Sequence, residues 1–158
     1  MAGKAHPGRP VKLIVRPLEA GDAQAAVRIT RLCAETAVWP EESYARLGEA
    51  GYRGWVAEAG GEIVGFLVAR GAADEAEILN LAVAPEFRRR GYGSELAAEA
   101  LREFRRQEIR RVFLEVRESN RAGIRFYGRL GFRVTGRRSA YYEVPREDAL
   151  CMTLGLAP

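Results

Sequence analysis

Three arginines and two glycines stand together at the start of a predicted helix. Residues 88–90 are all arginine, Gly91 and Gly93 follow, and Pro85 ends the strand before them. The first N–H groups of a helix favour an anion, glycine lets a ligand approach the backbone, and arginine suits phosphate. The pattern therefore predicts a phosphate-binding turn. A solvated arginine face is the alternative, because the full G-x-G-x-x-G and G-K-S/T motifs are both absent.

A carboxylate interrupts the apolar stretch over residues 111–116, which predicts a strand. Glu115 alternates with Leu114 and Val116, so we expect it to point to the opposite face of the sheet. A carboxylate inside an apolar strand is costly unless it is paired or solvated. Two interpretations follow: Glu115 pairs with one of the many arginines, or it faces a cleft as a general base.

A tyrosine and an asparagine lie in the next predicted helix, residues 119–130. The hydroxyl of Tyr127 has the chemistry of a general acid, but Ile124, Tyr127 and Leu130 also have the helical spacing of core residues. Asn120 fits a helix cap. Because no Cys or Ser lies beside a His in the sequence, a covalent enzyme intermediate is disfavoured.

The elements that must position these residues alternate between strands and helices. Asp22 is the expected cap near the start of the first helix, and Gly60-Gly61 predicts a hairpin turn. The predicted strands are 12–18, the two arms of the hairpin 53–71, 76–85, 111–116, 131–138 and 148–154, and the predicted helices are 20–38, 40–51, 94–107 and 119–130. This order predicts a mixed α/β sheet flanked by helices.

Length and composition limit the class of protein. The 158 residues fit one domain over 11–158, and residues 1–10 resemble a flexible tail. No apolar run spans a bilayer and no secretory signal is present, so we expect a cytoplasmic protein without membrane contact. A single histidine and two distant cysteines predict no metal site. The net charge of +4 suits an anionic partner, but acidic and basic residues are interspersed, so direct nucleic-acid binding is not expected.

The stretch "LAVAPEFRRRGYGSELAAEAL" resembles the acetyl-CoA signature of the GNAT acetyltransferases. That signature is a strand ending V-x-P, then R/Q-x-x-G-x-G/A, then a helix, and Val83, Pro85, Arg88, Gly91 and Gly93 match it in register. The resemblance continues through "FLEVRESNRAGIRFYGRLGF" and covers most of the chain from about residue 11. It implies the GNAT fold: a central, mostly antiparallel sheet that is splayed between the fourth and fifth strands and flanked by helices.

The resemblance also implies how acetyl-CoA is bound. Backbone N–H groups of the turn would hold the pyrophosphate, and a strand with a bulge would pair through Leu81 and Val83 with the pantetheine arm. Asn120 matches a position that hydrogen-bonds the pantetheine region. The implied cofactor-binding residues are Leu81, Ala82, Val83, Arg88, Arg89, Arg90, Gly91, Tyr92, Gly93, Ser94 and Asn120.

Within the family, "LEVRESNRAGIRFY" and "RSAYYEVPREDALCMTL" resemble the bacterial ribosomal-protein alanine N-acetyltransferases. This implies Glu115 as general base, Tyr127 as general acid, and direct attack of an amine in a ternary complex. The expected acceptor is the α-amine of a protein N-terminus, with an N-terminal alanine of a ribosomal protein as the leading candidate. Trp39, Tyr141 and Tyr142 are expected to border the peptide groove.

Two segments beside that groove depart from the branch. Val-Trp-Pro replaces Pro-Trp-Ser, and "EVPR" replaces a loop that is usually richer in Pro, Asp and Gly. The acceptor therefore stays open, with a small-molecule amine or a lysine side chain as alternatives. A non-catalytic acyl-CoA-binding module is the alternative from another class, and the presence of both Glu115 and Tyr127 argues against it.

Overall fold

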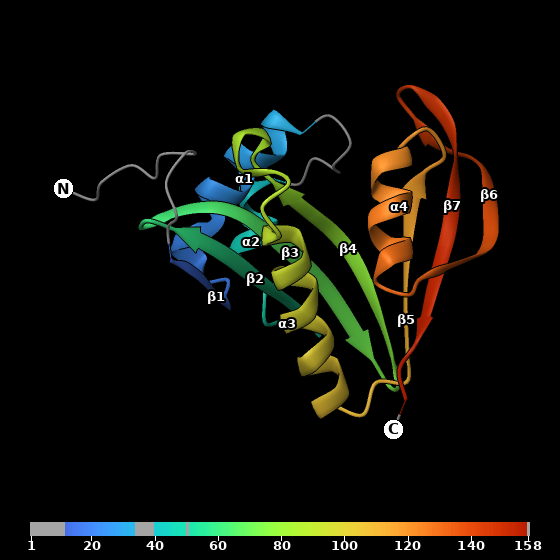
Figure 1. The fold of residues 1–158 in the computed structure, drawn as a ribbon, viewed down its shortest axis with the longest axis horizontal. Coiled ribbons are helices and arrows are strands. Elements are labelled where there is room, and N and C mark those ends of the chain that lie inside the picture. The colour runs from blue at the N-terminus through green and yellow to red at the C-terminus, as the bar shows by residue number, and fades with distance from the viewer. Residues whose placement is uncertain (1–11, 34–39, 50, 158) are drawn as a thin grey trace.

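A twisted sheet with helices on both faces forms the structure, a computed structural model that describes residues 12–33, 40–49 and 51–157 (Figure 1). Within these residues the strands are β1 Leu13–Pro17, β2 Tyr52–Ala59, β3 Glu62–Ala72, β4 Glu75–Val83, β5 Arg111–Arg117, β6 Arg133–Glu143 and β7 Arg146–Gly155. The α-helices are α1 Ala23–Leu32, α2 Glu41–Ala45, α3 Tyr92–Arg106 and α4 Arg121–Arg129, and short 3₁₀ turns span Ala20–Asp22 and Pro85–Phe87. The predicted mixed α/β class is confirmed. Trp39 and the tail over residues 1–10 lie outside the described residues.

The sheet is divided by one parallel pair of strands. Its order is β1-β2-β3-β4-β5-β7-β6, and β4 and β5 are parallel, whereas the other neighbours are antiparallel. β4 and β5 pair only from Glu75 and Arg111 to Ile78 and Leu114. Beyond these residues the strands diverge and open a V (Figure 1). The expected splay between the fourth and fifth strands is therefore confirmed.

A β-bulge in β4 lies at the point where the splay begins. Val68 of β3 pairs with Asn80, but the next residue, Ala69, pairs with Ile78, so Leu79 is an extra residue in β4. A bulge bends its strand and increases the local twist. The bulge expected from the family resemblance is present, and it turns the second half of β4 away from β5.

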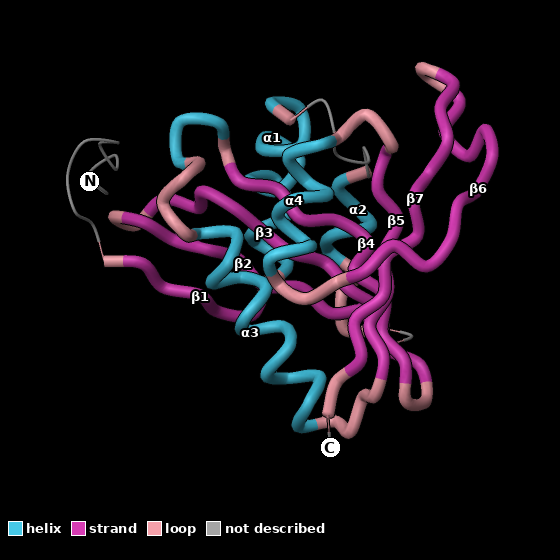
Figure 2. Tube along the Cα trace, turned by 45° about the vertical axis from the view of Figure 1, so that its right-hand side comes forward, coloured by secondary structure: helices cyan, strands magenta, loops and turns pink. Residues whose placement is uncertain are grey.

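Helices cover the two faces of the sheet unequally. On one face α3 packs over β2, β3 and β4 while α4 lies over β5 and β7 (Figure 1), and Leu96, Phe104, Leu114 and Met152 belong to the core between them. On the other face α1 and α2 pack over β2, β3 and β4, where Tyr44 belongs to a second core. β6 and β7 extend to one side of the sheet as a two-stranded arm (Figure 2).

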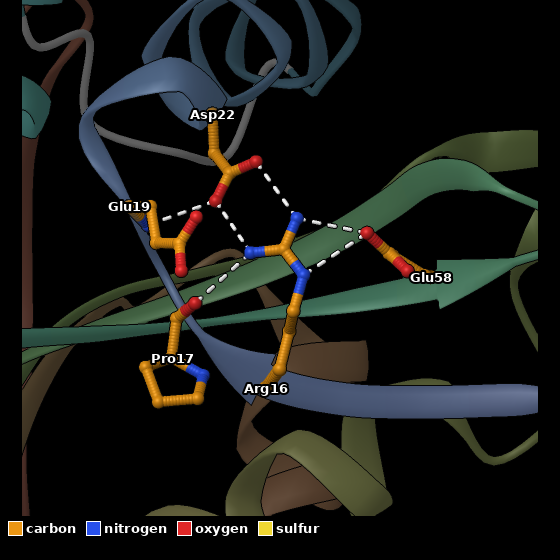
Figure 3. Close-up of polar contacts among 5 residues, drawn as sticks. All are labelled: Arg16, Pro17, Glu19, Asp22 and Glu58. Carbon is orange, nitrogen blue, oxygen red and sulfur yellow. Dashed lines mark hydrogen bonds and ion pairs between the residues drawn. The ribbon is translucent and has the colours of Figure 1, made fainter.

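An arginine joins β1 to the start of α1 and to β2 (Figure 3). The guanidinium of Arg16 donates to Asp22 at 2.7 and 2.9 Å and to Glu58 at 3.0 and 2.8 Å. Asp22 also accepts from the N–H of Glu19 at 2.8 Å. Asp22 occupies the N-cap position of α1, as predicted, but its side chain closes the 3₁₀ turn before α1 and makes no capping bond to α1 itself.

Several element boundaries differ from those predicted. The hairpin turn is as expected, since Gly60 and Gly61 have φ of 61° and 80°. In contrast, α2 has five residues instead of the twelve predicted over 40–51. β6 was expected to end at residue 138 but continues to Glu143. Its pairing with β7 is interrupted after Arg138 and resumes at Tyr142 in a shifted register.

Candidate active site

The arginine-glycine turn, residues 84–94, ends in an exposed helix start. Gly91 is the N-cap of α3 with φ of 83°, and the N–H of Glu95 donates to its carbonyl at 3.0 Å. The helix therefore begins at Tyr92, two residues earlier than predicted. Glycine suits the N-cap position here because it tolerates the left-handed region. The N–H groups of Tyr92, Gly93 and Ser94 precede this first helical hydrogen bond, where helices bind anions.

The three arginines of the turn have different environments. Arg88 is exposed overall, but its guanidinium donates through Nε to the carbonyl of Val83 at 3.1 Å and through Nη2 to Sγ of Cys33 at 3.2 Å. Arg89 and Arg90 are exposed, and the guanidinium of Arg90 lies 5.6 Å from the centre of the Phe87 ring. Arg88 thus organises the turn, whereas Arg89 and Arg90 present their charge to solvent.

The edge of β4 faces the V between the strands. The N–H of Ala84 donates to the carbonyl of Val64 on β3 at 2.8 Å. Because backbone groups alternate in direction along an antiparallel strand, those of Val83 and Leu81 point away from β3 and into the V. The carbonyl of Val83 accepts from Arg88 and from Cys33, so the N–H of Val83 is the backbone group left to face the V. Ala82 between them is buried in the second core.

Helix α4 forms the other side of the V. A Cβ added to Gly93 would lie 3.4 Å from the ring of Phe126, so α4 packs closely against the first turn of α3. Asn120 caps α4 by accepting from the N–H of Gly123 at 2.9 Å. The predicted cap is confirmed, and its contact with the pantetheine region stays a prediction.

Glu115 is the first residue of β5 beyond its pairing with β4. Leu114 and Val116 are buried in the core under the helices, so Glu115 points to the opposite face, as predicted. Its side chain is only 12% exposed, and Oε1 lies 2.8 Å from Nε of Arg138 on β6. The pairing with an arginine is therefore present. The hydroxyl of Tyr141 also bonds Glu115, and this bond is the main cause that raises the pKa of Tyr141 to about 12.

Tyr127 on α4 is partly buried and packs against the core from the helix side of the sheet. Its ring packs edge-on against Phe126 at 5.1 Å and Phe132 at 5.7 Å between ring centres. Burial raises the pKa of the Tyr127 hydroxyl far above its usual range, and the charge of Tyr142 adds to this effect. The ring thus packs as the helical spacing indicated, and the raised pKa keeps its hydroxyl protonated at neutral pH.

The arm formed by β6 and β7 carries the two tyrosines expected at the groove. Tyr141 and Tyr142 lie at the end of an irregular segment of β6. In this segment the register with β7 shifts between Arg138 and Tyr142, and Ala140 has φ of 51°. Tyr141 is 47% exposed. Tyr142 is partly buried and stacks on the guanidinium of Arg117 at 4.1 Å, so one tyrosine faces solvent and the other packs.

The sequence analysis missed two residues near Glu115, namely Arg138 and Glu77. Arg138 forms the ion pair described above, and the negative charges of Glu77 and Glu115 interact. Glu77 alternates with the apolar residues Ala76 and Ile78 in β4, the same signal that singled out Glu115 in β5.

The described part of the chain has neither a metal-binding cluster nor a membrane-spanning helix. Its His, Cys, Asp and Glu side chains form no group of three or more that could hold a metal ion. None of its helices combines the length and the apolar character needed to cross a membrane.

Comparison with known proteins identifies the class of enzyme that this fold and turn define. The model of the acetyltransferase (GNAT) family matches residues 24–132. The chain belongs to this family and is an acetyl-CoA-dependent N-acetyltransferase. The arginine-glycine turn, the bulged β4 and the V between β4 and β5 all lie within the matched region or border it.

Relatives with stated activities extend the comparison. The "[Ribosomal protein bS18]-alanine N-acetyltransferase" of Escherichia coli K12 is 32% identical over 145 residues, which are 90% of this chain and 97% of that protein. The crystal structure of the E. coli ribosomal-protein-S18-alanine N-acetyltransferase has a TM-score of 0.84 at 30% identity and covers 93% of this chain and 96% of that one. The structure of Ard1 from Thermoplasma volcanium has a TM-score of 0.83 at 30% identity, with coverage of 94% and 100%.

Proposed function

We propose that this enzyme acetylates the α-amine of a protein N-terminus, and that its acceptor is the N-terminal alanine of ribosomal protein bS18. The observation that carries the proposal is the similarity to the E. coli enzyme named for this reaction, which extends over 90% of this chain and 97% of that protein. The similarity thus extends over nearly the full length of both chains.

The turn and β4 would bind the cosubstrate. The N–H groups of Tyr92, Gly93 and Ser94 would hold the pyrophosphate, with the exposed Arg89 and Arg90 beside them. The backbones of Leu81 and Val83 would pair with the pantetheine arm at the open edge of β4, across the V from Asn120. Acetyl-CoA supplies the acetyl group as a thioester. The protein orients that thioester between β4 and β5, where backbone groups are left unpaired by the splay.

Two side chains would move protons in a direct transfer. Glu115 accepts a proton from the acceptor nitrogen at a carboxylate oxygen, directly or through a water, so that the neutral amine attacks the thioester carbonyl. As the carbon–sulfur bond breaks, Tyr127 donates its hydroxyl proton to the departing sulfur. The raised pKa of Tyr127 keeps this proton in place until the thiolate forms. The nitrogen loses its second proton to solvent as the amide forms, and solvent returns a proton to the Tyr127 oxygen.

The arm of β6 and β7 supports a peptide acceptor. Tyr141 exposes a rigid ring beside Glu115, and Val144 at the tip of the arm is 86% exposed. Both offer apolar contact to the first residues of an extended chain, and the tyrosine hydroxyl adds hydrogen-bonding capacity.

A peptide pair tests the proposal. The first peptide begins with the alanine of bS18 and carries an internal lysine; the second is the same peptide with a blocked N-terminus. With acetyl-CoA and the enzyme, mass spectrometry should show one acetyl group on the α-amine of the first peptide and none on the second. Acetylation of the lysine in the blocked peptide, or no product from either peptide, would contradict the proposed acceptor.

A further inference from the structure

A second carboxylate lies beside Glu115 on the face of the sheet away from α3 and α4. Ala76 and Ile78 on β4 are buried beneath α3, so Glu77 between them points to the opposite face. Glu77 is in register with Phe113 of β5, two residues before Glu115, and is likewise on the face opposite the buried Leu114. The parallel pairing therefore brings Glu77 and Glu115 to neighbouring strands on one face.

Few cations compensate these two carboxylates. Arg138 forms the 2.8 Å ion pair with Glu115, and its charge also reaches Glu77. Arg70 lies opposite Glu77 on β3, but its guanidinium is stacked over the ring of Tyr52 at 5.2 Å. No cation among the described residues lies close enough to Glu77 to form an ion pair with it. Arg138 is thus shared between two carboxylates, and this cluster of Glu77, Glu115 and Arg138 has one unbalanced negative charge.

This arrangement costs the folded protein stability. Burial is the main cause that raises the pKa of Glu77, and the negative charge of Glu115 raises it further, while Arg138 and Arg70 oppose the shift. A partly buried carboxylate that destabilises its own fold is typical of functional sites, where a ligand supplies the missing interaction. The missing interaction here is a positive charge.

Resting on the function proposed above, we propose that Glu77 and Glu115 together bind the positively charged amine of the acceptor, and that Arg138 neutralises Glu115 until the acceptor arrives. An α-ammonium group has one positive charge and so supplies the cation that Glu77 lacks. Glu77 holds the ammonium, and Glu115 then removes its proton. Glu77 is therefore a specificity-determining residue that selects cationic amines.

Steady-state kinetics with the alanine peptide test this role. Glu77→Gln should raise the KM for the peptide roughly tenfold, the size of one charge interaction in a partly solvated site, while kcat stays within a factor of about two. The KM for acetyl-CoA should not change. Glu75→Gln is the matched control, because Glu75 lies two residues away on the same strand and pairs with Arg111 at 2.9 Å. An unchanged peptide KM in Glu77→Gln would overturn the inference.

Thermal melting tests the same residue without any acceptor. Because the folded-state pKa of Glu77 is raised, its ionised form destabilises the fold at pH 7, and this penalty disappears below about pH 4, where Glu77 is protonated in both states. Glu77→Gln should therefore raise Tm at pH 7 and leave it unchanged at pH 3.5. A lower Tm at pH 7 would assign Glu77 a purely structural role and contradict the proposal.

Arg138 provides a test of opposite sign. Arg138→Gln removes the cation that competes with the acceptor, so the KM for the peptide should fall severalfold while Tm at pH 7 decreases. A raised KM would contradict the role of Arg138 as a temporary partner. The outcomes separate the two proposals: a wild-type enzyme that acetylates no N-terminal peptide contradicts the proposed function, whereas an active wild type with equal KM in Glu77→Gln contradicts this inference alone.

Discussion

The guanidinium of Arg88 donates through Nε to the carbonyl of Val83 at 3.1 Å, and so ties the arginine-glycine turn to the end of β4. This contact fixes the turn relative to the strand edge that faces the V. The two parts of the proposed cofactor site, the start of α3 and the open edge of β4, are therefore held in one geometry before any ligand binds. Such preorganisation lowers the entropic cost of binding.

Gly91→Val should weaken the binding of CoA. A Cβ at this position meets nothing within 4 Å, but φ of 83° is strained for a β-branched residue, by about 1–3 kcal/mol. Relief of this strain would turn the N–H groups of the first turn of α3 away from the pyrophosphate. Isothermal titration with CoA should show a weaker Kd, whereas Gly91→Asn should stay near wild type, because asparagine tolerates the left-handed region. Equal affinity in both variants would remove the pyrophosphate interpretation.

Tyr127→Phe should lower kcat by ~10²–10⁴-fold, the usual contribution of a general acid. The KM for acetyl-CoA should change little, because the ring and its contacts with Phe126 and Phe132 remain. Tyr44→Phe is the control, since that buried hydroxyl contacts Thr30 at 3.1 Å and its loss should reduce Tm without reducing kcat. A wild-type kcat in Tyr127→Phe would leave Tyr127 as a packing residue only.

Glu115→Gln should lower kcat/KM for the peptide, and the loss should shrink as pH rises past ~8, where the α-amine loses its own proton. The ion pair with Arg138 predicts only a small loss of Tm, because the arginine side chain is 61% exposed and keeps its access to water. Glu118→Gln, which removes an exposed partner of Arg137, should leave the profile unchanged. A ratio of variant to wild type that is independent of pH, with a clearly lower Tm, would indicate that Glu115 only supports the sheet.

Asp22→Asn should destabilise the fold in a manner that depends on pH. The hydrogen bonds from Arg16 are the main cause that lowers the pKa of Asp22. Its ionised form therefore stabilises the fold above pH ~4, and this contribution is lost as pH falls toward the lowered value. We expect a loss of about 1–3 kcal/mol at pH 7, measured by denaturant unfolding, that narrows below pH 4. Glu49→Gln, at an exposed pair with Arg46, should change stability by less than about 1 kcal/mol at either pH. A loss that is constant with pH would contradict the assignment to the Arg16 pair.

The sequence by itself determined the features that depend on neighbouring residues. The pair Gly60-Gly61 predicted the hairpin, and the amphipathic stretch over residues 94–107 predicted α3, although the helix begins two residues earlier. The alternation around Glu115 placed its side chain on the face opposite the core. These features follow from backbone preference and from periodicity, which act over a few residues.

The tertiary structure decided which distant residues meet. Arg138 and Glu115 are on strands β6 and β5, which are separated by β7. The arginine side chain reaches across β7 to Glu115 from a position next to the irregular segment of β6. Glu77 lies near Glu115 because β4 and β5 are parallel and in a register that no local pattern specifies. Arg88 differs from Arg89 and Arg90 because only its side chain reaches Val83. Strand pairing and side-chain direction depend on the packing of the whole sheet, so the charge balance around Glu115 follows from the fold rather than from the order of residues.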